Sequence, residues 1–351
     1  MVTFGLQLKH NEMKRILFIS CFILAIFSSC SNKSLTFPDY KYTTVYFAYQ
    51  SPLKTLVLGN DIFDNTLDNE HKTTIMATLG GVYQNNKNVS ISVSVDPTLC
   101  NNLQFDGTTN PVIAMPSNYY TLPKDMTITI PSGSVMGGLE VQLTDAFFAD
   151  PRSITNTFVI PLRMNTVTNA DSILSGKSDL SKPDPRIVGN WITVPKNYIL
   201  YGVKYINPFH GNYLRRGAEA IKDNAGDTTV VYHAQYVEKD QLCSMGTLSM
   251  TKDSVLLNAK TRANVNLPFQ LVLSFDSKNA CTISNPSAAA YAISGSGEFV
   301  KDGDSWGDQK RDVLHLKYTV DFGTSTHSFT DTLVIRDRGV KFETFNPVVI
   351  N

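Results

Sequence analysis

The chain has 351 residues, enough for two domains of ordinary size once a leader is removed. It carries 31 basic and 31 acidic residues, so its net charge is zero and no basic field is available to neutralise nucleic-acid phosphates. Charged residues make up only 18% of the chain and apolar residues 42%, which excludes an intrinsically disordered protein. The composition predicts a globular protein with no nucleic-acid partner.

Residues 1–30 predict export. The basic pair Lys14-Arg15 precedes an apolar run, residues 16–27, which is too short for a membrane-spanning helix and ends in small residues before Cys30. This order is that of a secretory signal peptide with a few upstream residues, and its end resembles the bacterial lipobox, in which Cys30 is lipidated. A plain signal peptide is the alternative. We predict an outer-membrane lipoprotein at the cell surface, the periplasmic face being the alternative, with residues 31–42 as a tether.

Residues 43–175 predict the first domain, an immunoglobulin-like (Ig-like) antiparallel β-sandwich. Apolar and polar residues alternate in 89–95, 126–130 and 139–143, which is the pattern of half-buried strands. The apolar run 158–164 contains Pro161, which predicts an edge strand or a bulge. Short strands separated by Gly, Pro and Asn turns are typical of sandwiches.

Residues 176–188 predict a linker, because they hold prolines, serines and charges and almost nothing to bury. Residues 189–351 predict a second β domain, a lipocalin-like meander barrel or a strongly curved sheet, from alternation in 230–236 and 314–322. Asp337-Arg338-Gly339 predicts a hairpin turn, and Tyr213–Asp223 predicts a helix. The fold class is therefore mostly β.

Three cysteines remain after the leader. Cys100, Cys243 and Cys281 are too widely spaced for a metal cluster or a disulfide framework. Cys243 and Cys281 either pair within the second domain or stay free and buried. No metal and no cofactor are expected from this pattern.

Several segments resemble a known family. In the first half these are LGNDIFDN (Leu58–Asn65), LGGVYQNN (Leu79–Asn86) and VQLTDAFFADP (Val141–Pro151), and in the second LYGVKYINPFHGNYLRRG and DTLVIRDRGVKFE. Together they resemble a two-domain family of Bacteroidetes surface lipoproteins, both domains being of unknown function. The N-terminal module is similar to one that precedes family 18 glycoside hydrolase domains. The resemblance implies a role in glycan utilisation and brings no catalytic residue.

Catalytic motifs are missing from the sequence. Neither HExxH nor GxSxG occurs, and scattered Ser, His and Asp residues cannot be joined into a triad from spacing alone. Glycoside hydrolysis needs two facing carboxylates, which sequence distance does not establish. The GKS at Gly176–Ser178 belongs to the linker. We therefore expect no enzyme and assign no catalytic residue.

Two loops concentrate oxygen ligands. The Asp302–Asp308 loop and the set Asn60, Asp61, Asp64, Asn65 and Asp68 offer carboxylates and amides that calcium could use, but neither follows the EF-hand pattern. A solvated hairpin loop is the favoured interpretation of Asp302–Asp308. We assign no metal ligand.

Two groups of residues are candidates for ligand binding. The first is Trp306 with Asp304 and Asp308, because an aromatic ring among carboxylates suits a sugar ring and its hydroxyls. The second combines rings and hydrogen-bond donors and comprises Tyr205, Phe209, His210, Tyr213 and Arg215. The alternative is structural: Trp306 caps the barrel, and the second group covers core surface.

The leading functional hypothesis is a lipid-anchored, non-catalytic surface protein that binds glycans. Its expected partners are a glycan or oligosaccharide, the membrane through the anchor, and transport or hydrolase proteins of a polysaccharide-utilisation system. A cell-adhesion or protein-interaction module is the first alternative, and a cryptic glycoside hydrolase the second. An exposed edge strand or a broad apolar patch would favour adhesion.

Overall fold

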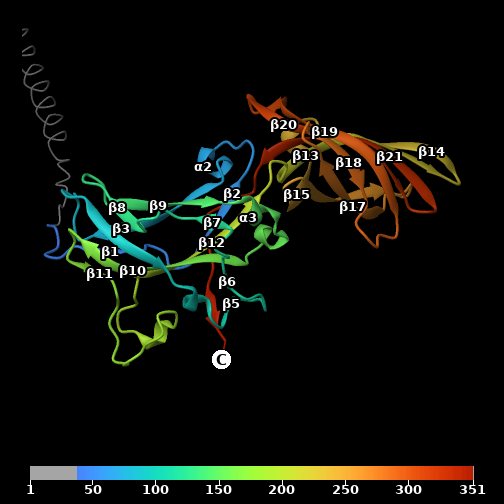
Figure 1. Ribbon diagram of the computed structural model, residues 1–351. Helices are drawn as coiled ribbons and strands as arrows, with labels where there is room; N and C mark the ends of the chain where they lie inside the picture. Colours follow the sequence, from blue (N-terminus) through green and yellow to red (C-terminus); the bar gives the residue numbers. More distant parts are fainter. Residues whose placement is uncertain (1–37, 351) are drawn as a thin grey trace, which may run out of the picture. The chain divides into compact units, whose positions relative to one another are not determined.

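The computed structural model describes residues 38–350 (Figure 1). Strands account for 54% of the chain and helices for 7%, so the mostly-β prediction is confirmed. The strands form one large sheet in the N-terminal part and a closed barrel in the C-terminal part, both inside the compact unit Lys41–Asn351. The predicted signal peptide and Cys30 lie outside the described residues. Within the described part, no helix has the length and apolar character needed to cross a membrane.

The N-terminal sheet has twelve strands in the order β11-β1-β3-β9-β8-β4-β10-β12-β2-β22, with β6 beside β10 and β7 beside β9. Most pairings are antiparallel, but β1–β11, β10–β6 and β12–β2 are parallel. The strands are β1 (Thr44–Tyr46), β2 (Pro52–Val57), β3 (Lys72–Gly80), β4 (Val89–Val95), β6 (Ile113–Ala114), β7 (Tyr120–Thr121), β8 (Thr127–Ile130), β9 (Met136–Leu143), β10 (Phe158–Thr168), β11 (Ser172–Ile173), β12 (Tyr198–Ile206) and β22 (Glu343–Thr344).

Most buried apolar residues of this sheet form one core, as expected for a sandwich, and a smaller cluster that includes Val159, Leu200 and Phe345 is separate from it. Ile75 and Val141 come from strands on one side of β8, and Ile91, Ile160 and Val203 from strands on the other, yet all five are fully buried in one cluster. The two halves of the sheet therefore face each other across a shared interior. The alternation that predicted strands at 89–95 and 139–143 corresponds to this buried face.

The sheet turns from one half to the other at a pair of glycines. β8 and β9 are paired only through Thr129 and Gly138. A Cβ at Gly137 would lie 2.2 Å from the carbonyl oxygen of Thr129, so no larger residue fits where the two strands cross.

Pro161 lies in a central strand, so the expected edge strand is wrong. β10 runs between β4 and β12, and Pro161 pairs with Leu200 of β12. On its other side β4 has already ended at Val95, and the carbonyl of Pro161 accepts from Asp96 N–H at 2.9 Å. The absence of an N–H on Pro161 therefore leaves no acceptor of a neighbouring strand without its hydrogen bond. The bulge in β10 falls later, between Met164 and Thr166.

The expected boundary between the domains differs from the strand pairing. β12 pairs with β10 and β2, and Ile199 and Tyr205 belong to the first core, so residues 198–206 are part of the N-terminal sheet. The predicted linker, 176–188, lies in the loop between β11 and β12, and Lys177 forms a bridge with Thr193 within that loop. Composition misplaced the boundary because this long surface loop has the polarity of a linker.

The C-terminal sheet closes on itself. Its order is β14-β13-β15-β16-β17-β18-β19-β20-β21, and β21 pairs again with β13, which gives an eight-stranded antiparallel barrel as predicted. The strands are β13 (Gly211–Asp223), β14 (Gly226–Tyr232), β15 (Gln241–Ser249), β16 (Lys252–Lys260), β17 (Asn266–Phe275), β18 (Ala280–Ser284), β19 (Ala292–Trp306), β20 (Gln309–Asp321) and β21 (Ser325–Asp337).

Two local predictions in this part are wrong. Tyr213–Asp223 is strand β13 rather than a helix, and it pairs along most of its length with β21. Asp337-Arg338-Gly339 makes no hairpin: after β21 the chain leaves the barrel, and β22 pairs with β2 of the first sheet. A last strand, β23 (Pro347–Val349), then pairs with β5 (Leu103–Phe105).

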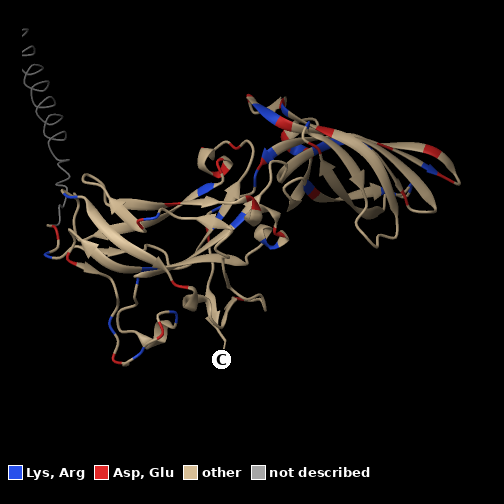
Figure 2. Ribbon diagram, viewed as in Figure 1, with Lys and Arg blue, Asp and Glu red and all other residues tan. Residues whose placement is uncertain are grey.

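The helices are short and lie in connections. They are α2 (Thr66–Asn69), α3 (Asp145–Ala149), η1 (Pro97–Cys100), η2 (Pro151–Ile154), η3 (Val188–Asn190) and η4 (Val237–Lys239). The three described cysteines are buried and free, so Cys243 and Cys281 do not pair. Charged residues are scattered over both sheets, with blue and red segments interspersed in Figure 2, which fits the neutral composition.

Candidate functional site

The second group of predicted binding residues lies in the interior. Tyr205 is 1% exposed and its hydroxyl donates to Phe148 O at 3.1 Å, while Tyr213 is fully buried and donates to Phe209 O at 2.6 Å. Arg215 is fully buried against Asp331. These polar atoms already have internal partners, so the structural alternative describes all three residues.

Phe209 and His210 also serve the interior of the barrel. The Phe209 ring stacks on Phe275 with centroids 3.6 Å apart. His210 Nδ1 accepts from the Thr247 N–H at 3.2 Å, which assigns the imidazole proton to Nε2. Burial lowers the pKa of His210 to about 4, so the ring is neutral at physiological pH.

The first group lies on the hairpin between β19 and β20. Trp306 is the last residue of β19 and is partly exposed; its Nε1–H donates to Ile335 O at 3.1 Å. The Arg311 guanidinium carbon lies 4.5 Å from the centre of the indole ring and covers one face. Asp304 accepts from Ser305 N–H, and Asp308 occupies the turn with φ 58°. The ring is thus anchored from β21 and supports an arginine.

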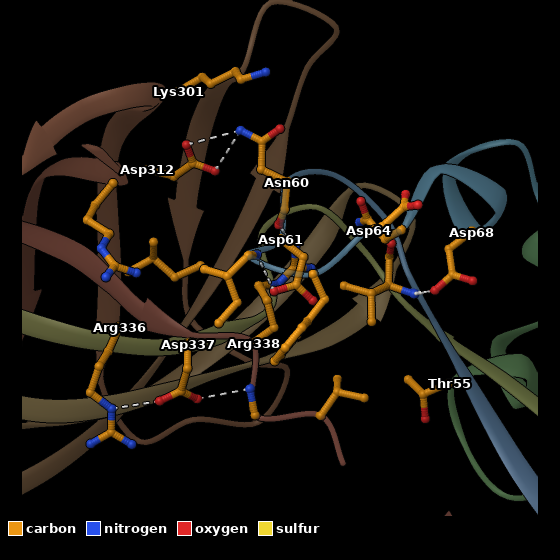
Figure 3. A pocket seen from close by; sticks show the side chains of 18 of the residues that line it. Thr55, Asn60, Asp61, Asp64, Asp68, Lys301, Asp312, Arg336, Asp337 and Arg338 are labelled. Atoms are coloured by element: carbon orange, nitrogen blue, oxygen red, sulfur yellow. Dashed lines mark hydrogen bonds and ion pairs between the residues drawn. The ribbon is translucent and has the colours of Figure 1, made fainter. Parts of the chain in front are cut away.

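That arginine lines a pocket of about 670 Å³, the candidate functional site (Figure 3). The pocket brings together the two oxygen-rich loops that the sequence analysis described separately. One side is formed by the segment after β2, and the other by β19, β20 and the end of β21. Its lining residues are Lys54, Thr55, Val57, Asn60, Asp61, Ile62, Phe63, Asp64, Asn65, Asp68, Lys301, Asp302, Lys310, Arg311, Asp312, Ile335, Arg336, Asp337, Arg338, Gly339 and Val340.

Arg338 holds the inner end of this pocket together. It is only 5% exposed and donates to four carbonyl oxygens: those of Leu58 and Asn60, and those of Asn207 and His210 just before β13, at 2.6 to 3.0 Å. Burial lowers its pKa, while the charges of nearby groups, Asp61 among them, oppose that shift. One guanidinium thus fixes three segments that are distant in sequence.

A second link joins the two sides of the pocket. The Asn60 amide lies 3.4 Å from both carboxylate oxygens of Asp312, and Asp312 also accepts from Asp302 N–H at 2.9 Å. Figure 3 shows Asp61 between the side chains of Asn60 and Arg338. Among the described residues, its side chain accepts one hydrogen bond, from the neighbouring Ile62 N–H to Oδ1. Asp61 therefore keeps acceptor capacity for a ligand.

The remaining carboxylates of the pocket are fixed by local partners. Asp68 pairs with Lys54 at 2.7 Å, and Asp64 accepts from Thr66, whose hydrogen bonds lower the pKa of Asp64. Burial opposes ionisation of Asp337, but hydrogen bonds from Arg336 and Asn212 lower its pKa. Asp64 and Asp337 therefore stay ionised at neutral pH.

Free cations and exposed rings complete the lining. Lys301 and Lys310 form no ion pair with any described residue, and Phe63 at the rim is 72% exposed. Among the described residues there is no group of three or more His, Cys, Asp or Glu side chains arranged to hold a metal ion. The arrangement can donate to and accept from a polar ligand on several sides while an apolar ring packs on one face of it.

The sequence did not reveal Arg338, Phe63 or the meeting of the two loops. Arg338 binds main-chain carbonyls from separate segments, and carbonyls carry no sequence signal. The oxygen-rich composition of both loops was the only available indication. Trp306 was found, although it supports Arg311 rather than lining the pocket.

Comparison with known proteins gives a family. A model described as an N-terminal domain matches residues 40–171, and the domain of unknown function DUF5627 matches residues 208–339. A crystal structure of a Bacteroides ovatus protein of unknown function is 42% identical, with a TM-score of 0.82, and the match covers 89% of this chain and 100% of that one.

More distant structures share too little to support an argument. A second Bacteroides ovatus protein of unknown function is 12% identical with a TM-score of 0.39, over 87% of this chain and 99% of that one. A third, provisionally named a carbohydrate binding protein, is 13% identical with a TM-score of 0.26, over 88% and 100%. No protein of curated function matches significantly. The chain therefore belongs to the same two-domain family of unknown function as the 42% identical Bacteroides ovatus protein.

Proposed function

We propose that this protein is a lipid-anchored accessory protein that binds glycans at the cell surface, and that the pocket containing Asp61, Phe63 and Asp312 is the binding site. It would work beside transport and hydrolase proteins of a polysaccharide-utilisation system. The main observation in support is that one pocket combines an exposed phenyl ring with carboxylates, amides and two lysine ammonium groups that form no ion pair with any described residue.

The size and chemistry of the pocket support this proposal. About 670 Å³ lies within the range of small-molecule sites and accommodates one or two sugar rings. A sugar ring presents apolar C–H groups on its faces and hydroxyls at its edge. Phe63 can pack on a face, while Asp61 accepts from hydroxyls and Lys301 and Lys310 donate to them.

The test is a binding screen of the purified protein against neutral and acidic glycans, followed by affinity measurements on two variants. Phe63→Ala and Asp61→Asn should each weaken binding tenfold or more, equivalent to about 1.4 kcal/mol. Tyr236→Ala is the matched control, because Tyr236 is 57% exposed and does not line the pocket. It should leave the affinity unchanged.

Trp306→Ala probes the support of the pocket rather than its lining. Removing the indole takes away the surface on which Arg311 lies, so we expect a smaller loss of affinity than in Phe63→Ala. Binding of no glycan would reject the proposal and favour protein partners, the adhesion alternative. Binding that survives both Phe63→Ala and Asp61→Asn would place the site elsewhere.

The anchor has its own test. Cys30→Ser should release the protein from the membrane fraction and abolish incorporation of labelled palmitate in cells. Protease treatment of intact cells distinguishes surface from periplasmic exposure. Retention of the label in Cys30→Ser would reject lipidation at that residue.

A further inference from the structure

Outside the pocket, the barrel brings together Ser325, His327 and Glu219, side chains that sequence spacing could not connect. Ser325 Oγ lies 2.8 Å from His327 Nε2, and His327 Nδ1 lies 2.5 Å from Glu219 Oε1. Ser325 and His327 are two residues apart in β21 and so share a face, while Glu219 comes from the neighbouring strand β13. The three groups form a continuous hydrogen-bonded chain.

Glu219 is held rigidly at the inner end of this chain. It is fully buried, accepts the hydroxyl of Tyr232 on Oε2 and accepts Lys260 N–H at 3.1 Å on Oε1. His327 is also fully buried. An ionised carboxylate only accepts, so its hydrogen bond assigns the imidazole proton to Nδ1 and leaves the Nε2 lone pair for the Ser325 hydroxyl.

Access distinguishes Ser325 from its two partners. Ser325 is partly exposed where β21 begins, next to the turn that follows β20, whereas the acid and the imidazole are shielded from water. Thr324, directly before it, is exposed, and its N–H has no hydrogen-bond partner among the described residues. The partly buried ring of Phe322 lies edge-on to His327, with centroids 5.1 Å apart. A hydroxyl bonded to a buried imidazole, an adjacent N–H without an internal partner and an apolar ring thus lie in one short segment.

We propose that Ser325 is an activated nucleophile, with His327 as its general base and Glu219 as a positioning residue, in a second site that cleaves esters of small carboxylic acids. These are the roles of the serine–histidine–acid arrangement, which is recognised by geometry and recurs on unrelated folds. The site is separate from the pocket and does not depend on glycan binding there.

The reaction is an acyl transfer to water. Ser325 Oγ attacks the ester carbonyl carbon and forms a C–O bond while its proton moves to His327 Nε2. The C–O bond to the alcohol then breaks, and the alcohol leaves with that proton. Water attacks the acyl-serine by the same path, which releases the carboxylic acid and restores the serine. No oxidant, reductant or cofactor is required.

The first experiment treats the folded protein with an alkyl fluorophosphonate and maps the adduct by peptide mass spectrometry. The serine oxygen forms a bond to phosphorus, and fluoride leaves. We expect the label on Ser325 and its loss in Ser325→Ala. Ser328→Ala is the control, because Ser328 is exposed on the same strand and its hydroxyl contacts only Thr319 Oγ1. An unlabelled Ser325 in the wild-type protein would overturn the proposal without any variant.

The second experiment separates catalysis from structure through p-nitrophenyl acetate hydrolysis. Glu219→Gln and His327→Gln should lower kcat at least 100-fold, with thermal unfolding recorded to show that the variants are folded. The wild-type rate should rise with pH along the titration of one base, and that dependence should vanish in His327→Gln. A folded His327→Gln protein that reacts at the wild-type rate would refute the role of the imidazole.

Discussion

The interiors of the two sheets differ in kind. The main core of the N-terminal sheet consists mostly of apolar side chains, and its buried polar contacts include neutral hydrogen bonds such as the one between Thr73 Oγ1 and Tyr201 Oη at 2.7 Å. The barrel buries ionisable side chains beside its apolar residues. Arg215, Glu219, His327 and Asp331 are each 1% exposed or less.

The difference indicates that different interactions stabilise the two parts: apolar packing in the N-terminal sheet, and pairing of buried charges in the barrel. The stability of an apolar core depends on the volume and shape of its side chains, and the core tolerates small changes in them. A buried charge loses its hydration and stays only if it is paired and hydrogen-bonded. The stability of the barrel should therefore depend strongly on each buried partner and on pH, and that of the first sheet should depend on them much less.

The largest effect is expected from Arg215→Met. The change keeps a similar volume but leaves the Asp331 carboxylate, 3.0 Å from Arg215 Nη2 in the native protein, without a cation in the interior. We expect a loss of about 3–5 kcal/mol in the free energy of unfolding, measured with urea. The double variant Arg215→Met/Asp331→Leu should recover most of it, because no charge then stays buried.

Ile160→Val is the counterpart in the first core. Ile160 is fully buried, and removing one methyl group there should lower stability by about 0.5–1.5 kcal/mol. If Arg215→Met were no more costly than Ile160→Val, the buried pair would contribute nothing beyond packing. The distinction between the two interiors would then fail.

A second effect concerns pH, through two buried groups with opposite shifts. Burial raises the pKa of Asp253 to about 7, so its contribution to stability is present below pH 3.8 and is lost as pH rises through 7. Burial lowers the pKa of His210 to about 4, so its contribution is present above pH 6.5 and is lost as pH falls through 4. Between pH 4 and 6.5 the contribution of Asp253 to the free energy of unfolding falls with rising pH, while that of His210 rises, so the two oppose each other.

A variant that removes one of the two groups should reveal the pH dependence that the other gives to the free energy of unfolding. In Asp253→Asn the free energy of unfolding should fall as pH drops from 6.5 to 4, and in His210→Gln it should fall as pH rises from 4 to 7. Each change should be about 3–4 kcal/mol at most. Hydrogen exchange should place both changes in the barrel strands. Slopes of the same sign in both variants would contradict the assignment.

The same contrast explains what the sequence could and could not predict. Alternation found β4, β9 and β20 because their buried faces are apolar. It failed for β13, where Arg215 and Glu219 occupy buried positions of the strand, so the period of two is hidden and the segment resembled a helix. A strand that buries charges cannot be recognised by hydrophobicity.

The candidate site was predictable only as composition. The oxygen-rich loops around Asp61 and Asp302 were noted, but their meeting depends on Arg338 and on the bridge from Asn60 to Asp312. Likewise Ser325, His327 and Glu219 are connected only by strand register. The whole fold determines which residues of distant strands come into contact, so no local sequence pattern predicts these contacts.

A last effect sharpens the comparison with one substitution made in both interiors. Tyr318→Phe removes a hydroxyl that donates to the Asp331 carboxylate at 2.6 Å and should lower stability by about 1.5–3 kcal/mol, because the acceptor is charged and buried. Tyr201→Phe removes the neutral bond to Thr73 and should lower it by about 1 kcal/mol. The atoms deleted are identical, so the difference between the two urea unfolding experiments isolates the charge of the partner. Equal losses would mean that the barrel interior behaves as an ordinary core and that its charged groups are retained for reasons other than stability.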